Sequence, residues 1–340
     1  MQHRITQPSN LLDHHGRLIQ TGYATSPLLI YNRKDVAKKF RLKEWDYYSI
    51  SSRKWAFTLT VGNSIGFLLI SATLLDFRYG YKHSKTVIRF VPKWKLPESS
   101  QTGNILYKDK RVELSIVHKC NRRYLSLYME DFLGPSDLEA YIVLSKEPRD
   151  SMVIATPFTE NSKYFYYNRK IIGMAASGYV RIRNRYYSFK PRNSFGVFDW
   201  GRGVWPYKTN WYWSCAHGFI GNDAFGFNLG CGFGDTSAAT ENMLFFNGVA
   251  NKLAHVHFFI KKKNGRFEYM KPWLVASSDN RIKMFFLPII DRAVKLSIIF
   301  LSTDQHLIFG RFYGRAVLDN GKVIFFKGLP GFIERFINRW

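Results

Sequence analysis

The chain has 340 residues, of which 46% are hydrophobic, 17% aromatic and 22% charged. This composition excludes a disordered chain, and the length exceeds what one hydrophobic core usually organises, so we expect two cores or one large β assembly. The formal net charge of +25 comes from both parts of the chain, with 24 Lys and Arg against 14 Asp and Glu in residues 1–150, and 26 against 11 in residues 151–340.

This charge creates a positive field that attracts nucleic acid, anionic lipid head groups or acidic partners. The densest basic run, RKDVAKKFRLK at residues 33–43, is typical of a solvated face or a short basic helix. Nucleic-acid binding is disfavoured, because proteins that bind single strands interleave aromatic and basic residues, whereas here the aromatic residues concentrate where basic ones are missing. Peripheral contact with an anionic membrane stays open as an alternative.

Three cysteines, Cys120, Cys215 and Cys231, form neither an even set nor a CxxC pair, and no signal peptide precedes MQHRITQPSN. We therefore expect a cytoplasmic protein, with peripheral association at the inner face of the membrane as the alternative. Residues 55–75 carry no formal charge and are long enough to span a bilayer. Because GNS at 62–64 would place a polar turn near the membrane centre, the segment is predicted to be a buried β-hairpin.

Short apolar runs separated by turn residues predict many antiparallel strands. In residues 179–189, Val180 and Ile182 alternate with arginines, so one face of that strand is expected to meet water. The clearest hairpin covers residues 306–326, where DNG supplies residues that tolerate a positive φ. Further strands are predicted at residues 124–130, 141–145, 254–260 and 283–290.

The last residues, GFIERFINRW, predict a C-terminal helix, because Phe332, Phe336 and Trp340 are four apart and form one stripe. SKEPRD at residues 145–150 combines Pro with mixed charges and predicts a boundary. We therefore expect an all-β, mainly antiparallel chain with few short helices, in which two β-barrel or sandwich halves occupy residues 1–150 and 151–340.

Residues 209–251 contain no Lys or Arg and are rich in aromatic residues, glycine and small polar groups. These strands form either the centre of the core or the lining of a cavity, since ligand cavities are largely apolar with a few placed polar groups. The second interpretation predicts an aromatic pocket for an apolar ligand, walled by Trp205, Trp211 and Trp213.

Asp199 and Glu241 flank this aromatic segment and are the candidate catalytic residues. A carboxyl group among tryptophans loses hydration, which raises its pKa and lets it donate a proton near neutral pH. Alternatively, Asp199 pairs with Arg202, whose guanidinium stacks on an indole, and DWGRGVWPY at residues 199–207 is a rigid turn. The further residues assigned to ligand binding are Arg202, Asn228, Asp235 and Asn242.

Three other patterns are weaker. GCGFGD at residues 230–235 departs from the dinucleotide fingerprint, because its last glycine would fall at Asp235. His255 and His257 share one face of a strand but lack a third ligand, so no metal is predicted. Cys215 and His217 lie two residues apart, yet a buried, inert cysteine is the favoured interpretation. No cofactor is expected.

Several motifs occur in an order that strongly resembles the uncharacterised, mainly bacterial family catalogued as domain of unknown function 2804. They include LKEWDYY (42–48), FYYNRK (165–170), DWGRGVWPY (199–207), WYWSCAHG (211–218), GFNLGCGFGD (226–235), ATENMLFFNG (239–248) and DQHLIFGRF (304–312). More loosely, the pattern resembles the tandem lipocalin-like proteins, which include carotenoid hydratases and tocopherol cyclases. That resemblance implies two β-barrel halves that hold an isoprenoid-like ligand.

Three functions follow as hypotheses. The first is binding of a hydrophobic, lipid- or isoprenoid-like small molecule in the aromatic pocket. The second is an acid-catalysed hydratase, cyclase or isomerase with Asp199 or Glu241 as the proton donor. The third is a basic protein that binds a membrane surface or nucleic acid. No obligate protein partner is expected.

Overall fold

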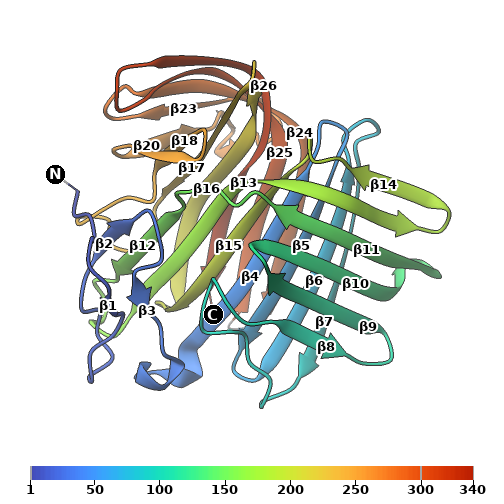
Figure 1. Ribbon diagram of the computed structural model, residues 1–340, viewed down its shortest axis with the longest axis horizontal. Helices are drawn as coiled ribbons and strands as arrows, with labels where there is room; N and C mark the ends of the chain where they lie inside the picture. Colours follow the sequence, from blue (N-terminus) through green and yellow to red (C-terminus); the bar gives the residue numbers. More distant parts are fainter. Residues whose placement is uncertain (1, 299–300, 340) are drawn as a thin grey trace.

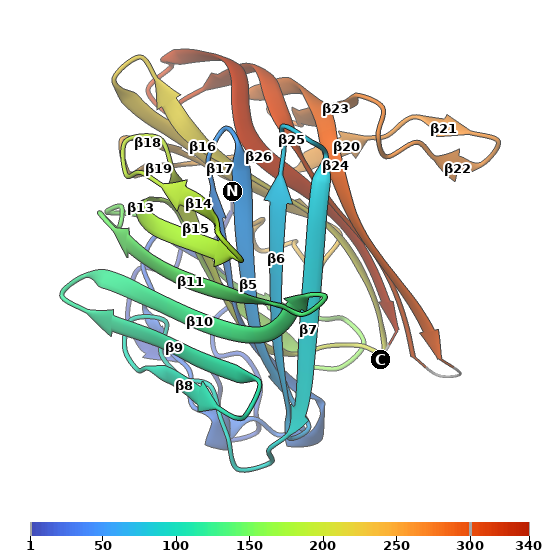
Figure 2. The same ribbon diagram turned by 90° about the vertical axis from the view of Figure 1, so that its right-hand side faces the viewer.

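The computed structural model describes residues 2–298 and 301–339. Within this part of the chain, a 13-stranded sheet, a nine-stranded sheet and two two-stranded sheets make up the β-structure. Each large sheet curls on itself, and the two large sheets pack against each other (Figures 1 and 2). The predicted all-β, mainly antiparallel class is therefore confirmed.

The first sheet has the strand order β7-β6-β5-β4-β15-β13-β11-β10-β9-β8, with β12 and β14 also paired to β13, and β2 paired to β12. Its strands are β2 (Gly22–Ala24), β4 (Leu42–Ser51), β5 (Trp55–Ser64), β6 (Phe67–Asp76), β7 (Tyr81–Phe90), β8 (Ile105–Lys108), β9 (Val112–Lys119), β10 (Arg122–Leu133), β11 (Ser136–Ser145), β12 (Met152–Pro157), β13 (Phe165–Ile182), β14 (Arg185–Phe189) and β15 (Phe195–Val204). Lys85 of β7 donates to the main-chain oxygens of Glu130 and Asp131 in β10 at 2.7 and 2.8 Å, which ties the two arms of the curl together.

The second sheet has the order β19-β18-β17-β16-β26-β25-β24-β23-β20. Its strands are β16 (Lys208–Ile220), β17 (Asp223–Cys231), β18 (Met243–Phe246), β19 (Val249–Lys252), β20 (Val256–Phe259), β23 (Trp273–Ser277), β24 (Ile282–Ile298), β25 (Leu301–Val317) and β26 (Val323–Arg339). The chain thus passes from one large sheet to the other between β15 and β16. The division into halves at residue 150 stays a prediction about domains.

Short elements complete the chain. β1 (Ser9–Asn10) pairs with β3 (Leu29–Ile30), β21 (Lys262–Lys263) pairs with β22 (Arg266–Phe267), and two 3-10 helices, η1 (Arg33–Asp35) and η2 (Lys39–Arg41), fall in the basic run. In residues 2–298 and 301–339, no helix has the length and hydropathy needed to span a bilayer.

The uncharged segment at residues 55–75 is a β-hairpin, as predicted. β5 and β6 pair from Trp55–Asp76 to Ser64–Phe67, and the chain reverses at Ile65 and Gly66, which have φ values of 53° and 80°. The turn therefore comes just after GNS, whose residues belong to β5. The predicted hairpin over residues 306–326 is also present, with DNG between β25 and β26 and Gly321 at φ 83°.

The prediction of a C-terminal helix is wrong, because residues 323–339 form strand β26. Phe332 and Phe336 are four residues apart, a spacing that keeps two side chains on one side of a helix and also of a strand. β26 lies between β16 and β25, where Phe332 pairs with Phe309 and Cys215. Trp340, the third member of the predicted stripe, lies outside the described residues.

The prediction that DWGRGVWPY is a rigid turn is also wrong. Residues 199–204 belong to β15, a buried strand between β4 and β13. The glycines serve close packing in this strand, because a side chain at Gly201 would overlap the indole of Trp45, and one at Gly203 would meet the main chain of Phe165. Glycine within a strand is thus explained by close approach of neighbours.

Buried apolar side chains form three clusters. One fills the curl of the first sheet, one fills the curl of the second, and the third lies between the sheets and includes Trp205, Trp213, Phe309 and Phe332. The face that β4 to β7 contribute to the space between the sheets carries many hydroxyl groups. The buried hydroxyl-bearing residues on this face are Ser49, Thr58, Ser71 and Thr73.

Candidate functional site

A group of polar side chains lies between the two large sheets. Side chains alternate along a strand, and the register places Lys170 of β13 opposite Asp199 of β15, which in turn lies opposite Tyr47 of β4. From the second sheet, Asn228 on β17 and Glu241 in the loop after β17 reach the same place. We call Asn168, Lys170, Asp199, Asn228 and Glu241 the Lys170 cluster.

Lys170 lies at the centre of this cluster. Its Nζ donates to Asn168 Oδ1 at 2.7 Å, to Glu241 Oε2 at 2.9 Å and to the Tyr166 hydroxyl at 3.0 Å. Asp199 Oδ1 lies 4.0 Å from the same nitrogen. Lys170 therefore uses all three of its N–H groups within the protein and acts on its surroundings further away through its charge.

Asp199 is held by hydrogen bonds on both oxygens. Asn168 Nδ2 donates to Oδ1 at 2.6 Å, and Trp45 Nε1 approaches Oδ2 at 3.4 Å. Burial raises the pKa of Asp199 above its usual value, although the Lys170 cation and these hydrogen bonds oppose the shift. Burial alone would lower the pKa of Lys170. The nearby Glu241, Tyr166 and Asp199 have a larger effect in the other direction, so the pKa of Lys170 is raised. The cluster thus combines a cation with a carboxyl group that resists ionisation.

The second sheet adds a further buried carboxyl group, Glu334 of β26. Trp211 Nε1 donates to its Oε2 at 2.9 Å, and Gln305 Nε2 donates to its Oε1 at 2.5 Å. Burial raises the pKa of Glu334 as well. The indole of Trp213, on the same strand as Trp211, donates to Asn228 Oδ1 at 2.7 Å, which links the tryptophans to the Lys170 cluster.

Phe233 lies in the loop after β17 and contacts four aromatic rings that belong to different segments. The ring centroids lie 4.7 Å from Tyr166, 4.9 Å from Trp211, 5.2 Å from Phe158 and 5.3 Å from Trp205, and every pair is edge-to-face. We call these four residues the aromatic box. Because the Tyr166 hydroxyl also contacts Lys170, the box and the Lys170 cluster share a wall.

A cavity of about 210 Å³ opens beside Phe233. Its lining is mostly polar and includes Thr209, Asn210 and Asp235, with Phe158 and Phe233 as its aromatic members. Ligand sites usually have about 300–1,000 Å³, so this cavity would hold only a small molecule or part of a larger one.

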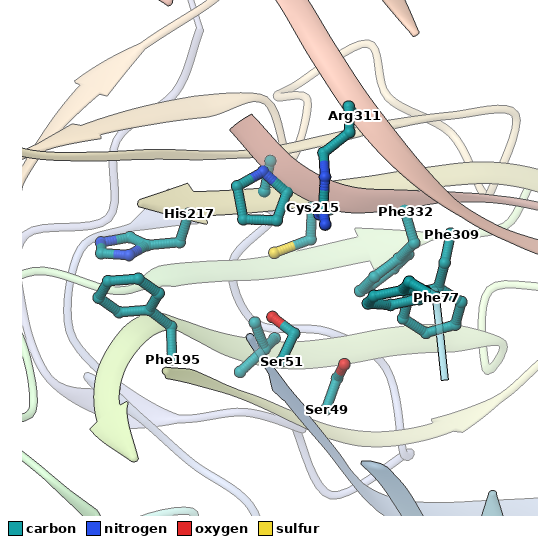
Figure 3. Close-up of a pocket in the computed structure, with 13 residues that line it drawn as sticks. Ser49, Ser51, Phe77, Phe195, Cys215, His217, Phe309, Arg311 and Phe332 are labelled. Atoms are coloured by element: carbon teal, nitrogen blue, oxygen red, sulfur yellow. The ribbon is translucent and has the colours of Figure 1, made fainter. Parts of the chain in front are cut away.

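A second cavity lies at the other end of the space between the sheets (Figure 3). Its volume of about 10 Å³ is room for a single water molecule. The rings of His217 and Phe195 lie together at one end, with Phe77, Phe309 and Phe332 grouped at the other. Burial lowers the pKa of His217 to about 4 and raises that of Cys215, so both are neutral near pH 7 and do not form a thiolate–imidazolium pair.

The predicted ligand-binding residues are only partly brought together. Asn228 belongs to the Lys170 cluster, Trp205 and Trp211 belong to the aromatic box, and Trp213 donates a hydrogen bond to Asn228. None of the three tryptophans lines either cavity. Asp235 lines the larger cavity. Asn242 instead accepts from Gly230 N at 2.7 Å and donates to Ala254 O at 2.9 Å, so it fixes the main chain.

Arg202 does not take part in this site. It lies three positions from Asp199 on a strand and therefore faces the other side of the sheet, where it is fully buried and pairs with Asp46 at 3.0 Å. The expected stacking on Trp200 is present, with a separation of 4.4 Å from the ring, but the expected pair with Asp199 is not found among the described contacts.

Sequence reasoning missed Lys170, Asn168, Tyr166, Glu334 and Phe233. The first three alternate in FYYNRK, so their common face could have been recognised as a strand pattern. Across the described ranges, no three His, Cys, Asp or Glu side chains come together as a metal site, and His255 and His257 are exposed.

The family model for Domain of unknown function (DUF2804) matches residues 2–340, so the chain belongs to this family. No curated protein matches the sequence. The solved structure of an AttH-like protein from Nitrosomonas europaea is similar in fold, with a TM-score of 0.56 and 10% identity over 88% of this chain and 92% of that one. Both resemblances, to the family and to the tandem lipocalin-like fold, are thus confirmed.

Two further solved structures are less similar. Kievitone hydratase from Nectria haematococca has a TM-score of 0.49 and 10% identity over 98% of both chains. CghA has a TM-score of 0.44 and 7% identity over 88% of both chains. At 10% identity, the similarity to the AttH-like protein shows a shared fold and nothing about activity.

Proposed function

We propose that this member of the DUF2804 family binds a small, largely apolar molecule between its two sheets and directs a polar group of that molecule toward the Lys170 cluster. The observation that carries the proposal is a buried cation and a buried carboxyl group that share a wall with the aromatic box. Ligand sites commonly combine an apolar lining with a few convergent polar groups.

The Lys170 cluster buries charge between the two sheets. Removing ionised groups from water is costly, and apolar side chains of similar volume often give equal or greater stability. Stability alone therefore gives no reason to keep Lys170, Asp199 and Glu334 between the sheets, whereas perturbed pKa values of this kind concentrate at functional sites. Structural ion pairs perturb pKa values too, so the experiment has to separate the two roles.

Native mass spectrometry after detergent-free purification tests the proposal. We expect the wild-type protein to carry an apolar molecule, and the Lys170→Met variant to lose it. Lys322→Met is the matched control, because Lys322 also contacts a carboxylate, at 3.5 Å, but does so on the surface. A wild-type protein that is always empty, or a Lys170→Met variant that keeps its ligand, would contradict the proposal.

A second candidate function, proton transfer to the bound molecule, is favoured by the raised pKa of Asp199. Lys170 disfavours a carbocation nearby but favours an oxyanion. The geometry therefore suits an isomerase or hydratase acting on an alkene next to a carbonyl better than a cyclase that forms a cation. In such a hydratase, water adds to the β-carbon as the C=C bond breaks and its electrons move to the carbonyl oxygen, which accepts a hydrogen bond from Tyr166, whose hydroxyl accepts from Lys170. Asp199 gives its proton to the α-carbon and then takes the proton that the added water releases, so it returns to its acid form.

A further inference from the structure

The aromatic box is already filled by a side chain of the protein. Phe233 makes edge-to-face contacts with all four rings of the box, at centroid distances of 4.7–5.3 Å, yet it is itself only half-buried. The box is assembled from Phe158 after β12, Tyr166 on β13, Trp205 after β15 and Trp211 on β16, so both large sheets contribute to it.

Phe233 is carried by a short segment with a hinge on each side. Gly232 and Gly234 have φ values of 87° and 71°, a region that glycine adopts without strain. The segment is anchored on both sides, because Cys231 pairs with Tyr212 in the sheet and the N–H of Asp235 donates to Pro157 O at 2.8 Å. A movement of Phe233 therefore requires only Gly232–Gly234 to change conformation, while the strands stay in place.

The cavity beside Phe233 gives a ligand a route from solvent to the aromatic box. Gly232, Phe233 and Gly234 are all part of the lining of the 210 Å³ cavity, whereas three members of the aromatic box, Tyr166, Trp205 and Trp211, are not. Phe233 therefore stands between the cavity and these rings. Withdrawal of its side chain would join the cavity to the box and, through Tyr166, to the Lys170 cluster.

A polar atom in the box lacks a partner. Trp205 is 6% exposed, and its buried Nε1–H has no hydrogen-bond acceptor within the described part of the chain. A buried donor without an acceptor is costly, and such groups are commonly satisfied by a ligand or by water. An occupant of the box that carried an acceptor, such as a ketone or phenol oxygen, would satisfy this N–H, which the hydrocarbon ring of Phe233 cannot do.

We propose that Phe233 occupies the place of a ligand ring, and that a planar cyclic molecule with a hydrogen-bond acceptor displaces it into the neighbouring cavity. This inference rests on the proposed function and narrows its ligand class from a small, largely apolar molecule to a flat ring that carries an acceptor. The affinity of the wild-type protein for this ligand is then the intrinsic affinity multiplied by the fraction of molecules in which Phe233 has left the box.

The test measures binding of 6-propionyl-2-dimethylaminonaphthalene, a neutral, flat aromatic ketone whose fluorescence shifts to the blue in apolar sites. We expect Phe233→Ala to lower its dissociation constant at least tenfold relative to the wild type. Phe246→Ala, at another half-buried phenylalanine, is the matched control and should leave the constant unchanged. The double variant Phe233→Ala/Trp211→Ala should lose the gain, because it removes one wall of the box.

An unchanged dissociation constant in folded Phe233→Ala, or a gain that survives the loss of Trp211, would overturn the inference. If Phe233→Ala does not fold, Phe233→Leu takes its place with a smaller expected gain, and no gain there is equally decisive. The proposed function fails separately. If the wild-type protein carries a native ligand but Phe233→Ala binds the probe no more tightly, only the displacement of Phe233 is refuted. If the wild-type protein is always empty but Phe233→Ala binds the probe more tightly, only the proposed native ligand is refuted.

Discussion

At the scale of single residues, Lys170 is shared by two carboxyl groups. It lies 4.0 Å from Asp199 and 2.9 Å from Glu241, so one cation serves two carboxyl groups that come from different sheets. Burial still dominates at Asp199 and raises its pKa. A single side chain thus joins polar groups from the two sheets, while burial keeps the pKa of Asp199 raised.

The raised pKa of Asp199 predicts how stability depends on pH. The folded state holds the proton more tightly than the unfolded state, so the stabilising effect is present at low pH and is lost as the pH rises through the folded-state pKa. Asn cannot ionise, so the free energy of unfolding of Asp199→Asn relative to wild type should increase as the pH rises from about 4, the usual pKa of Asp, to the folded-state pKa, by about 1.4 kcal/mol for each unit of pKa shift. Urea unfolding at several pH values measures this, and a difference that decreases with pH would contradict it.

At the scale of secondary-structure elements, β15 shows how much of the site the sequence could predict. The closeness of the tryptophans and the carboxylate in the sequence predicts an acid among aromatic residues, and the Trp45 indole does approach Asp199 at 3.4 Å. A catalytic role for Asp199 stays a prediction. Its partner Lys170 was missed, since the contact depends on the pairing of β13 with β15, which local patterns do not reveal. The glycines suggest a turn, but close neighbours on the adjacent strands require them, namely Trp45 beside Gly201 and Phe165 beside Gly203.

Two glycines on the strands that flank β4 therefore predict different responses to alanine. Gly201→Ala would drive a methyl group into the Trp45 indole, and such overpacking typically costs about 1–3 kcal/mol. Gly62→Ala is the matched control, because its added carbon would lie 3.8 Å from its nearest neighbours. Urea unfolding should show a loss of stability for Gly201→Ala and little or no loss for Gly62→Ala. Equal effects would mean that Gly201 is not needed for packing.

At the scale of the whole molecule, the packing of the sheets joins the two halves into one unit. A complete cluster of buried side chains lies between them, and hydrogen bonds cross from one sheet to the other, such as Arg292 Nε to Thr73 Oγ1 at 3.1 Å. The all-β class followed from the many short apolar runs of the sequence. The way the curled sheets face each other could not be predicted from the sequence, because it depends on contacts between residues far apart in the chain.

We expect the two sheets to unfold together. Loss of either sheet would expose the shared cluster, including Trp213, Phe309 and Phe332, so a half-folded molecule would be costly. Hydrogen exchange with mass spectrometry across a urea series should show that peptides from β5 and β6 lose protection at the same urea concentration as peptides from β24 and β25. Two well-separated urea midpoints would show that the two large sheets unfold independently.

The hydroxyl-rich face of β4 to β7 has a consequence during synthesis. These strands leave the ribosome long before β24 to β26, their eventual cover, has been made. Ser71 and Thr73 bond to Thr86 and Ser84 of the neighbouring strand at 2.8 and 2.9 Å, so this surface satisfies itself and tolerates water in the interval. A purely aliphatic surface would be prone to aggregate before the second sheet is made, and the hydroxyl groups of β4 to β7 reduce that risk.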